Sequence, residues 1–387
     1  MKAGWQTKPF EDCIKKVTYT TKIQRKDFLP EGTHPIVSQE EDFINGYWNN
    51  EADLFKVETP VTIFGDHTKI LKYITFDFVL GADGVKILPP LHFLEPKFFF
   101  YQLQTANLES LGYARHYKLL KELKIVYPSR VEQQRIAAIL DQAFEGIAKA
   151  RANAEQNLQN ARALFESHLQ SVFTERSKGW TTKSVGELVT DGVLYKPFDG
   201  NHGEIHPRKS DFIASGVPFV MASDLVNGEV DTENCNHISK ELADSLRVGF
   251  AKNGDVLISH KGTIGRSALV TTSLEYIMLT PQVTAYRIKD RTRFLNKFIR
   301  YYFMSPIFQN EIISAAQDGS TRAYIGITRQ SNLRFIFPSV NEQQSIVDTS
   351  DQLLPETQRL EALYQRKIGL LDELKKSLLQ QAFAGEL

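Results

Sequence analysis

Cysteine is scarce in this chain of 387 residues, which contains only Cys13 and Cys235. Two cysteines are too few for a disulfide framework or a zinc cluster, so we expect a reducing, cytoplasmic compartment. Long apolar runs are also lacking, since no stretch approaches the roughly 18 to 20 residues that a membrane span requires. The first residues lack the apolar stretch of a signal peptide. We therefore expect neither a disulfide scaffold nor a membrane protein.

Motifs for catalysis and for cofactor binding are missing as well. Pro89-Pro90 lies between two leucines and does not match the Asn/Asp-Pro-Pro-aromatic motif of exocyclic amine methylation, and no Gly-x-x-x-x-Gly-Lys-Ser/Thr phosphate loop is present. Gly262 and Gly265 lack the third glycine of a dinucleotide loop. They predict a tight turn, whose amides either serve the turn alone or approach a DNA phosphate. We expect a non-catalytic protein with no cofactor, and the scattered histidines predict no metal site.

The net charge is zero, with 46 basic and 46 acidic residues, but the two signs are unevenly distributed. Residues 1–130 carry a net charge of +1 and residues 176–340 carry +4, whereas residues 131–175 and 341–387 carry −2 and −3. Binding to nucleic acid requires a local excess of Lys and Arg rather than an overall one. The zero sum therefore leaves a nucleic-acid partner open for the two basic segments.

One internal repeat is the most informative feature of the sequence. Residues 127–136 contain an aromatic-Pro-Ser-x-x-Glu-Gln-Gln-x-Ile string that returns at residues 337–346, an offset of 210. A second echo, Gly-Trp-x-Thr-Lys at residues 4–8 and 179–183, has an offset of 175. The two copies of the first string therefore follow regions that differ in length by 35 residues.

The segments that follow this string are predicted to be long helices, because apolar residues recur in them at spacings of three, four and seven. Pro355 and Gly369 should kink or weaken the second helix locally. Two such stripes are covered most economically by each other, as an antiparallel intramolecular coiled coil. Two independent helices, each lying on its own domain, remain the alternative. The stripes comprise Ile136, Leu140, Ile147, Ala154, Leu158, Ala161, Phe165 and Val172, and Ile346, Leu353, Leu360, Leu363, Leu371, Leu374 and Leu378.

The regions between the helices are predicted to be α+β domains, each with an irregular sheet. Short apolar runs at residues 61–64, 255–258 and 283–286 are bounded by Gly, Asp and Pro and predict strands. Residues 294–316 are long and periodic enough for one or two helices broken near Pro306. The tryptophans are expected to be packing residues rather than base-stacking ones: Trp5, Trp48 and Trp180.

The tandem arrangement resembles the specificity subunit of type I restriction-modification systems, and the resemblance covers the whole chain. In the second domain it rests on residues 253–258, 261–265, 319–322 and 337–346. The first domain has Phe64-Gly65-Asp66-His67-Thr68 where the second has its 261–265 turn, and it has Tyr113-Ala114-Arg115 where the second has Ser320-Thr321-Arg322.

The resemblance implies a non-catalytic subunit that binds double-stranded DNA and recruits two adenine methyltransferase subunits. In the full complex it implies restriction subunits, which are ATP-dependent translocases and nucleases. Residues 1–130 and 176–340 would be target recognition domains, each reading one half of a split site, and residues 131–175 and 341–387 would be spacer helices that fix the distance between the halves. Partner-binding residues are expected at the helix starts: Glu132, Gln133, Gln134, Glu342, Gln343 and Gln344.

Candidate DNA contacts are the polar and basic residues on or beside the motif turns, since such side chains bind phosphates and base edges. They are Lys261, Thr263, Arg266, Arg322 and Tyr324 in the second domain, and His67, Lys69, Arg115 and Lys118 in the first. The densest basic cluster is better explained as a solvated helix entrance: Arg287, Lys289, Arg291, Arg293, Lys297 and Arg300.

Two other classes of function stay open. One is a two-headed coiled-coil adaptor that binds proteins instead of DNA. The other is an enzyme with an unrecognised site.

Overall fold

The computed structural model describes residues 4–82, 84–109, 112, 114–175, 179–202, 204–316 and 324–387. The chain divides into two compact units, one made of Met1–Glu155 and Gln365–Leu387 and the other of Gln156–Tyr364. Each unit contains a strand-rich domain and part of each of two long helices. Among the described residues, no helix is long and apolar enough to cross a membrane.

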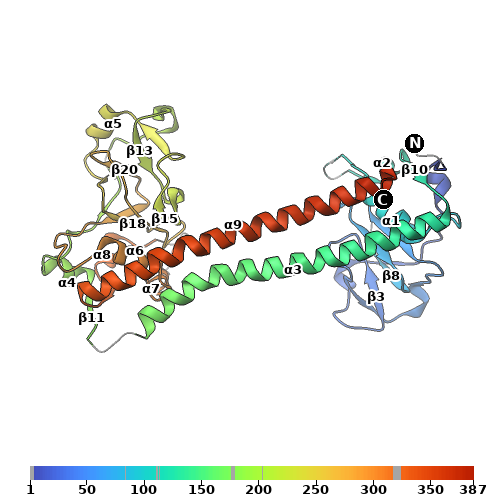
Figure 1. Ribbon diagram of the computed structural model, residues 1–387, viewed down its shortest axis with the longest axis horizontal. Helices are drawn as coiled ribbons and strands as arrows, with labels where there is room; N and C mark the ends of the chain where they lie inside the picture. Colours follow the sequence, from blue (N-terminus) through green and yellow to red (C-terminus); the bar gives the residue numbers. More distant parts are fainter. Residues whose placement is uncertain are drawn as a thin grey trace. The chain divides into compact units, whose positions relative to one another are not determined.

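The two long helices are α3 (Arg130–Thr174) and α9 (Val340–Ala384), each of 45 residues. In the first unit, Arg151 of α3 pairs with Asp372 of α9, and in the second unit Arg162 of α3 lies 3.2 Å from Glu361 of α9. From the first pair to the second, the residue number rises along α3 and falls along α9. The two helices therefore run antiparallel (Figure 1). The predicted antiparallel helix pair is confirmed, and the alternative of two independent helices is wrong.

Small and polar residues at seven-residue intervals occupy much of this helix interface. In the second unit, Ala161 of α3 is 4% exposed, Ser350 and Thr357 of α9 are at most 1% exposed, and the His168 ring of α3 contacts the Ser350 hydroxyl at 3.2 Å. Such side chains let two backbones approach closely. The helix α9 continues through Pro355 as one element. The proline removes one backbone donor, but packing against α3 supports the turns on either side.

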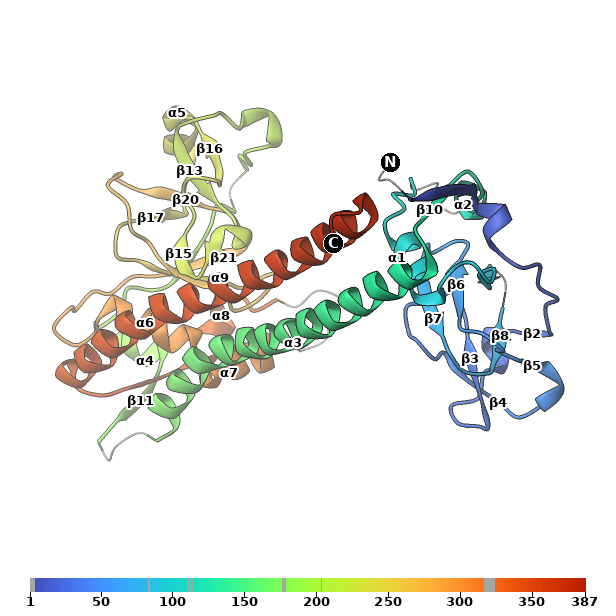
Figure 2. The same cartoon turned by 45° about the vertical axis from the view of Figure 1, so that its right-hand side comes forward.

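Within the described residues, the main body of the first domain contains a five-stranded sheet and a three-stranded sheet. Figure 2 shows their strands. One has the parallel strands β3 (His34–Val37) and β8 (Phe78–Gly81) at its centre, flanked by β2 (Lys22–Ile23), β4 (Gly46–Trp48) and β5 (Leu54–Phe55). The other has β6 (Val61–Gly65) between two antiparallel neighbours, β7 (Leu71–Ile74) and β9 (Val85–Leu88). The helices of this domain are α1 (Pro96–Gln104), α2 (Tyr117–Lys121) and the 3₁₀ turns Phe10–Cys13, Arg25–Asp27 and Glu51–Asp53.

The second domain repeats this topology. Its parallel pair is β13 (Val217–Val220) and β20 (Ile277–Leu279), flanked by the antiparallel strands β16 (Asn236–Ile238) and β17 (Phe250–Ala251). Its strand β18 (Val256–Ser259) lies between two antiparallel strands, β19 (Ser267–Leu269) and β21 (Val283–Tyr286). Equivalent strands follow one another in the same order along the chain in both domains. The predicted strands at residues 61–64, 255–258 and 283–286 are confirmed.

The second domain also carries elements that account for part of its greater length. The hairpin of β14 (Leu225–Val226) and β15 (Gly228–Val230) extends one sheet, as does β12 (Phe198–Asp199). The predicted helical region forms α6 (Asn296–Met304) and α7 (Pro306–Ala316), with the break at the expected proline. The other helices are α4 (Val185–Thr190), α5 (Lys240–Ser245), α8 (Ile327–Gln330) and the 3₁₀ turns Lys209–Asp211 and Ala222–Asp224.

A short strand pair closes each domain directly before its long helix. In the first domain, β1 (Gln6–Pro9) pairs antiparallel with β10 (Lys124–Tyr127), and in the second, β11 (Thr181–Ser184) pairs with β22 (Arg334–Phe337). The register joins Gln6 to Tyr127 and Thr181 to Phe337. Both sequence echoes, with offsets of 175 and 210, therefore belong to one structural feature that occurs twice.

Candidate nucleic-acid interface

In the first domain, the candidate residues lie on two loops that hydrogen bonds hold together. The turn between β6 and β7 is closed by Lys69 N–H, which donates to the Gly65 carbonyl at 2.8 Å. The backbone carbonyl of Asp66 accepts from His116 N–H at 2.8 Å, and its buried carboxylate accepts from Tyr117 N–H at 2.7 Å. His67 and Lys69 are thereby brought near the segment of Arg115 and Lys118. Arg115 and Lys118 are exposed, whereas Lys69 is half-buried.

The second domain builds a matching pair of loops. The turn after β18 is closed by Gly265 N–H, which donates to the Ser259 carbonyl at 2.9 Å, and Gly262 and Gly265 have φ of +80° and +92°. Such angles favour glycine, as the turn predicted from the sequence requires. The carbonyl of His260 accepts from Ile325 N–H at 3.0 Å, and Lys261 and Tyr324 form a β-bridge. Lys261, Thr263, Arg266 and Tyr324 are all exposed around this junction, and Arg322 lies outside the described residues.

Backbone hydrogen bonds define which residues of the two loop pairs are equivalent. Asp66 N–H donates to Gly84 O at 2.7 Å, and His260 N–H donates to Gln282 O at 2.9 Å. Asp66 thus corresponds to His260, and its neighbour His67 to Lys261. His116 N–H donates to the Asp66 carbonyl as Ile325 N–H donates to the His260 carbonyl, so Arg115 of the first domain corresponds to Tyr324 of the second. The sequence motifs align Arg115 with Arg322 instead, two residues away from this structural correspondence, because the loops differ in length.

A buried polar network lies beneath the turn of the second domain. The Thr284 hydroxyl lies 2.6 Å from Asp199 Oδ1 and 2.8 Å from His260 Nδ1, and Gln330 Nε2 donates to it at 2.9 Å. One hydroxyl has one proton, which goes to the carboxylate, so His260 must donate from Nδ1. The His260 ring is fully buried, and this burial lowers the pKa of its imidazole. His260 is therefore a neutral residue, and its hydrogen bond to Thr284 anchors the start of the turn in the core of the domain. Nothing in the sequence around His260 predicted this role.

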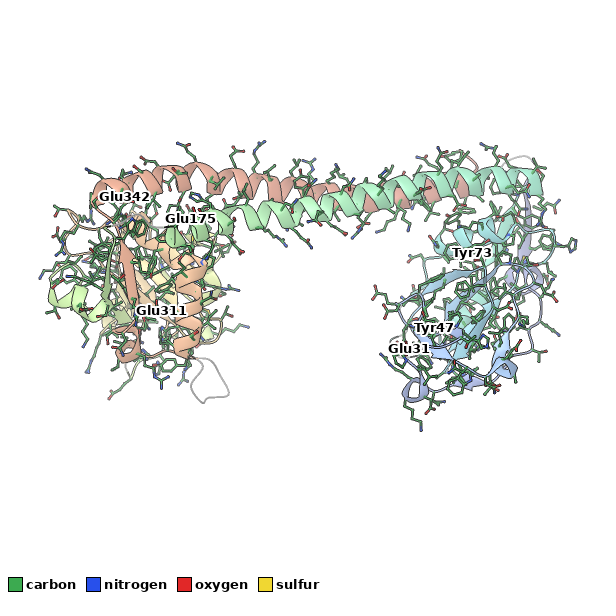
Figure 3. The ribbon with its side chains drawn as sticks, turned by 90° about the horizontal axis from the view of Figure 1, so that it is seen from below. Glu31, Tyr47, Tyr73, Glu175, Glu311 and Glu342 are labelled. Carbon is green, nitrogen blue, oxygen red and sulfur yellow. The ribbon has the colours of Figure 1, made fainter. Side chains whose placement is uncertain are left out.

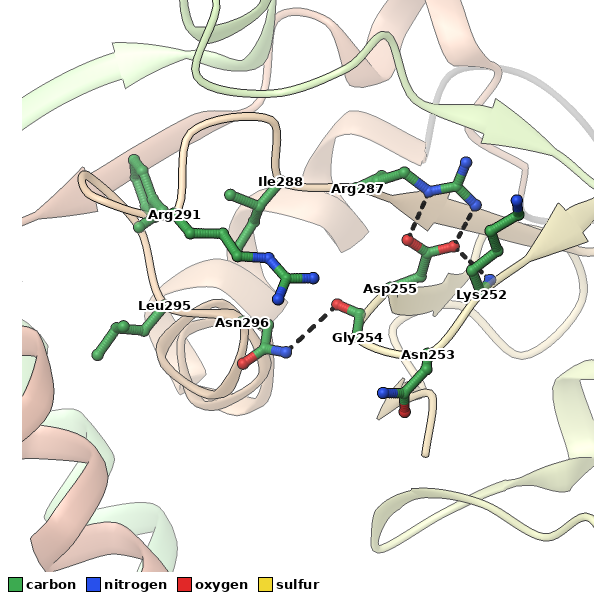
Figure 4. Close-up of a pocket in the computed structure, with 10 residues that line it drawn as sticks. Lys252, Asn253, Gly254, Asp255, Arg287, Ile288, Arg291, Leu295 and Asn296 are labelled. Atoms are coloured by element: carbon green, nitrogen blue, oxygen red, sulfur yellow. Dashed lines mark hydrogen bonds and ion pairs between the residues drawn. The ribbon is translucent and has the colours of Figure 1, made fainter. Parts of the chain in front are cut away.

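The predicted basic cluster is broken up by acidic partners, as Figure 4 shows for its first part. Arg287 lies 2.7 Å from Asp255, in the wall of a cavity of about 380 Å³ that Arg291 and the start of α6 also line. The pair raises the pKa of the Arg287 guanidinium. Lys297 lies 2.6 Å from Asp351, and Arg300 is buried. These pairings support the interpretation of the cluster as a helix entrance, but Arg300 is buried and not solvated as expected.

The Glu-Gln-Gln strings at the helix starts divide into buried and accessible residues. Gln133 is fully buried: it accepts from Glu95 N–H at 2.7 Å and donates to the carbonyls of Phe93 and Pro128 at 3.0 Å. Gln134 and Gln344 are exposed, and Glu132 and Glu342 are half-buried. Glu342, labelled in Figure 3, accepts from the Trp180 indole at 2.9 Å.

Gln343 makes the same contacts in the second domain. It accepts from Leu295 N–H at 3.1 Å and donates to the carbonyls of Arg293 and Pro338 at 3.0 and 3.1 Å. The middle glutamine of each string therefore joins the helix to its domain. The tryptophans also make contacts within their domains, which support the prediction of a packing role. The ring centres of Trp5 and Phe98 are 6.4 Å apart, those of Trp180 and Phe173 are 5.9 Å apart, and the Trp48 indole donates to Asp53.

Comparison with known proteins gives consistent matches to one family. The family model described as the type I restriction modification DNA specificity domain matches residues 2–160 and again residues 177–368. The specificity subunit of the type I restriction enzyme EcoBI from Escherichia coli is 24% identical over 368 residues, which cover 88% of this chain and 75% of that protein. The EcoR124I/EcoR124II specificity subunit from Escherichia coli is 23% identical, with coverage of 85% and 81%.

Solved structures share the fold. A chain of a type I restriction-modification system, solved in a study of complex assembly and conformational transition, is similar with a TM-score of 0.71 and 17% identity, covering 100% of this chain and 99% of that one. The HsdS subunit from Thermoanaerobacter tengcongensis is similar with a TM-score of 0.53 and 17% identity, covering 100% and 98%. Because the family model matches twice and spans most of the sequence, the chain belongs to the family of type I restriction-modification DNA specificity subunits, which are non-catalytic.

Proposed function

We propose that this subunit reads a bipartite site on double-stranded DNA, with one half read by each strand-rich domain. The observation that carries the proposal is the two-loop junction that occurs once per domain, with Lys261 and Tyr324 in the second and His67 and Arg115 at the equivalent places in the first. Residues 1–130 and 176–340 are the proposed target recognition domains.

The proposed DNA contacts are the cationic and polar side chains on and beside these two loop junctions. Arg and Lys there would bind phosphates and guanine edges, whereas Thr and Tyr would add neutral hydrogen bonds. The set comprises Lys261, Thr263, Arg266, Arg322 and Tyr324 in the second domain and His67, Lys69, Arg115 and Lys118 in the first. Lys69 is the weakest candidate, because its ammonium donates to the Leu108 carbonyl at 3.3 Å.

The long helices, residues 131–175 and 341–387, are the proposed spacer and the proposed docking surface for two methyltransferase subunits and, in the full complex, for restriction subunits. Each unit exposes leucines on its part of these helices: Leu164 and Leu363 are 47% and 54% exposed in the second unit, and Leu370 and Leu374 are 52% and 46% exposed in the first. Leu370 and Leu374 are one helical turn apart on α9, and exposed apolar side chains that lie together are typical of protein-binding surfaces. At the helix starts, Glu132, Gln134, Glu342 and Gln344 would contact partners. Gln133 and Gln343 would contribute indirectly, by holding the helices.

Methylome sequencing tests this function. A host that expresses this chain with its methyltransferase partner should carry a split, adenine-methylated motif, and the motif should vanish when the chain is omitted. An unchanged methylome, with the complex shown to assemble, would favour a protein adaptor instead.

A further inference from the structure

Each long helix is attached to its domain at a second polar point, eight residues beyond the buried glutamine. On α3 this point is Asp141, which accepts from the Tyr101 hydroxyl and lies 3.1 Å from Lys97 Nζ. On α9 it is Asp351, which accepts from the Tyr301 hydroxyl and lies 2.6 Å from Lys297 Nζ. We call these two groups the clasps: Lys97–Tyr101–Asp141 and Lys297–Tyr301–Asp351. The same three residue types thus recur at the same places in both domains.

Both attachment points of a domain lie along a single short helix. In the first domain, the residue before α1 binds Gln133, and Tyr101 near the end of α1 binds Asp141. In the second, the residue before α6 binds Gln343, and Tyr301 binds Asp351. The points on the long helix are separated by about 12 Å at 1.5 Å rise per residue. Apolar side chains such as Ile136 and Leu140 pack in the same core as α1 and hold the two surfaces together. One polar point would fix only a position on that apolar surface, whereas two points also fix the direction of the short helix.

Burial indicates that the clasps determine geometry more than stability. Tyr101 and Tyr301 are 5% and 0% exposed. A buried tyrosine hydroxyl requires a hydrogen-bond acceptor, and the packed ring fixes the position at which that acceptor must lie. The carboxylates are only partly buried, with side chains 47% exposed for Asp141 and 31% for Asp351. Ion pairs so accessible to water add little to the free energy of unfolding. Their directional contacts nevertheless set where the long helix lies on the domain.

The second clasp carries more charge than the first. Arg300, which is 6% exposed, lies 3.6 Å from Asp351 and donates to the Tyr301 hydroxyl. The first domain has Phe100 at the equivalent place, and there Lys97 lies 4.6 Å from the ring centre of Tyr73, labelled beside α1 in Figure 3. Removal of Asp351 would leave the buried Arg300 without its carboxylate, whereas removal of Asp141 has no such effect. The first clasp is therefore the better one to test.

We infer that the clasps fix the angle of each target recognition domain on its long helix and thereby determine how strictly the subunit selects the spacer between its half-sites. This inference rests on the function proposed above. One added base pair shifts a half-site by roughly 3.4 Å and turns it by about a tenth of a helical turn. A domain that cannot pivot cannot follow that movement, whereas a domain with one attachment point can.

The test uses the whole subunit in complex with its methyltransferase partner. Methylome sequencing of the wild type first defines the motif and its spacer. Asp141→Ala should keep both half-sites and raise methylation at spacers one base pair longer or shorter by about tenfold, the factor equivalent to about 1.4 kcal/mol. The matched control is Glu145→Ala, which removes an exposed acid four residues further along α3. It should retain the wild-type strictness.

A second variant guards against an effect of the alanine itself. Lys97→Met with Tyr101→Phe removes the other half of the clasp and should relax spacer selection in the same way. Unchanged spacer selection in both variants would overturn the inference and assign the angle to apolar packing. Complete loss of methylation in both, with Glu145→Ala active, would overturn it as well, because the clasp would then be required for folding. If the wild type itself methylates no split motif, the proposed function fails instead.

Discussion

At the start of each long helix, one buried glutamine, Gln133 or Gln343, forms hydrogen bonds with backbone groups from separate parts of the chain. We expect Gln343→Met, which keeps the volume but removes the amide, to lower the free energy of unfolding of the second unit by about 1–3 kcal/mol, because buried backbone groups lose their partners. Gln344→Met, at the exposed neighbouring position, should change it by less than about 0.5 kcal/mol. Denaturant unfolding measures both values, and equal effects would contradict the assigned role.

His260 makes stability depend on pH. Its folded-state pKa lies below the ordinary value of about 6.5, chiefly because the ring is buried, with Lys261 and His202 acting in the same direction and Asp199 opposing them. The unfolded chain therefore binds the proton first as the pH falls. Stability is complete above about pH 6.5 and decreases as the pH falls below it. Unfolding between pH 7 and pH 5 should show a smaller decrease for His260→Gln than for the wild type, and identical slopes would contradict this assignment.

At the level of single residues, the sequence predicted positions better than roles. The Glu-Gln-Gln strings were recognised because they occur twice, but burial of Gln133 and Gln343 depends on contacts with residues some 40 to 50 positions earlier. The network of His260 joins residues 24 to 85 positions apart in the chain. No local pattern records such contacts, so the sequence could not separate the exposed residues of these strings from the buried ones.

At the level of elements, regular periodicity made the long helices predictable. Apolar residues recur at spacings of three, four and seven from Ile136 to Val172 and from Ile346 to Leu378, which no strand would show. Pro355 does not end α9, which continues through it as one element, because packing against α3 supports the turns on both sides. Short strands were located by their apolar runs, whereas their pairing into parallel and antiparallel neighbours followed only from the structure.

The paired helices permit a direct test of the spacer role. One heptad inserted after Glu155 in α3 and another after Lys367 in α9 would fall at the same level, between the Arg151–Asp372 and Arg162–Glu361 pairs. Seven residues add about 10 Å of helix, which corresponds to roughly three base pairs of DNA. We expect the methylated motif to keep both half-sites and to gain about three base pairs of spacer. Loss of both half-sites, with the subunit folded, would contradict the spacer role.

At the level of the whole molecule, one plan is used twice. The two domains share the order and direction of seven strands although their loops differ in length, and each ends in a strand pair that leads into a long helix. The sequence revealed the strand pair and the long helix through its internal repeats. It did not reveal the shared order of the strands, because the strands are only two to five residues long and their side chains differ between domains.

The most direct test of one half-site per domain is methylome sequencing of two loop variants beside the wild type. Lys261→Ala with Tyr324→Ala alters the junction of the second domain, and Arg115→Ala with Lys118→Ala alters that of the first; all four residues are exposed, so folding should be preserved. Each variant should relax or lose recognition of a different half of the motif and keep the other half intact. If both variants weaken the same half, or if each weakens both halves equally, the two domains do not read separate half-sites.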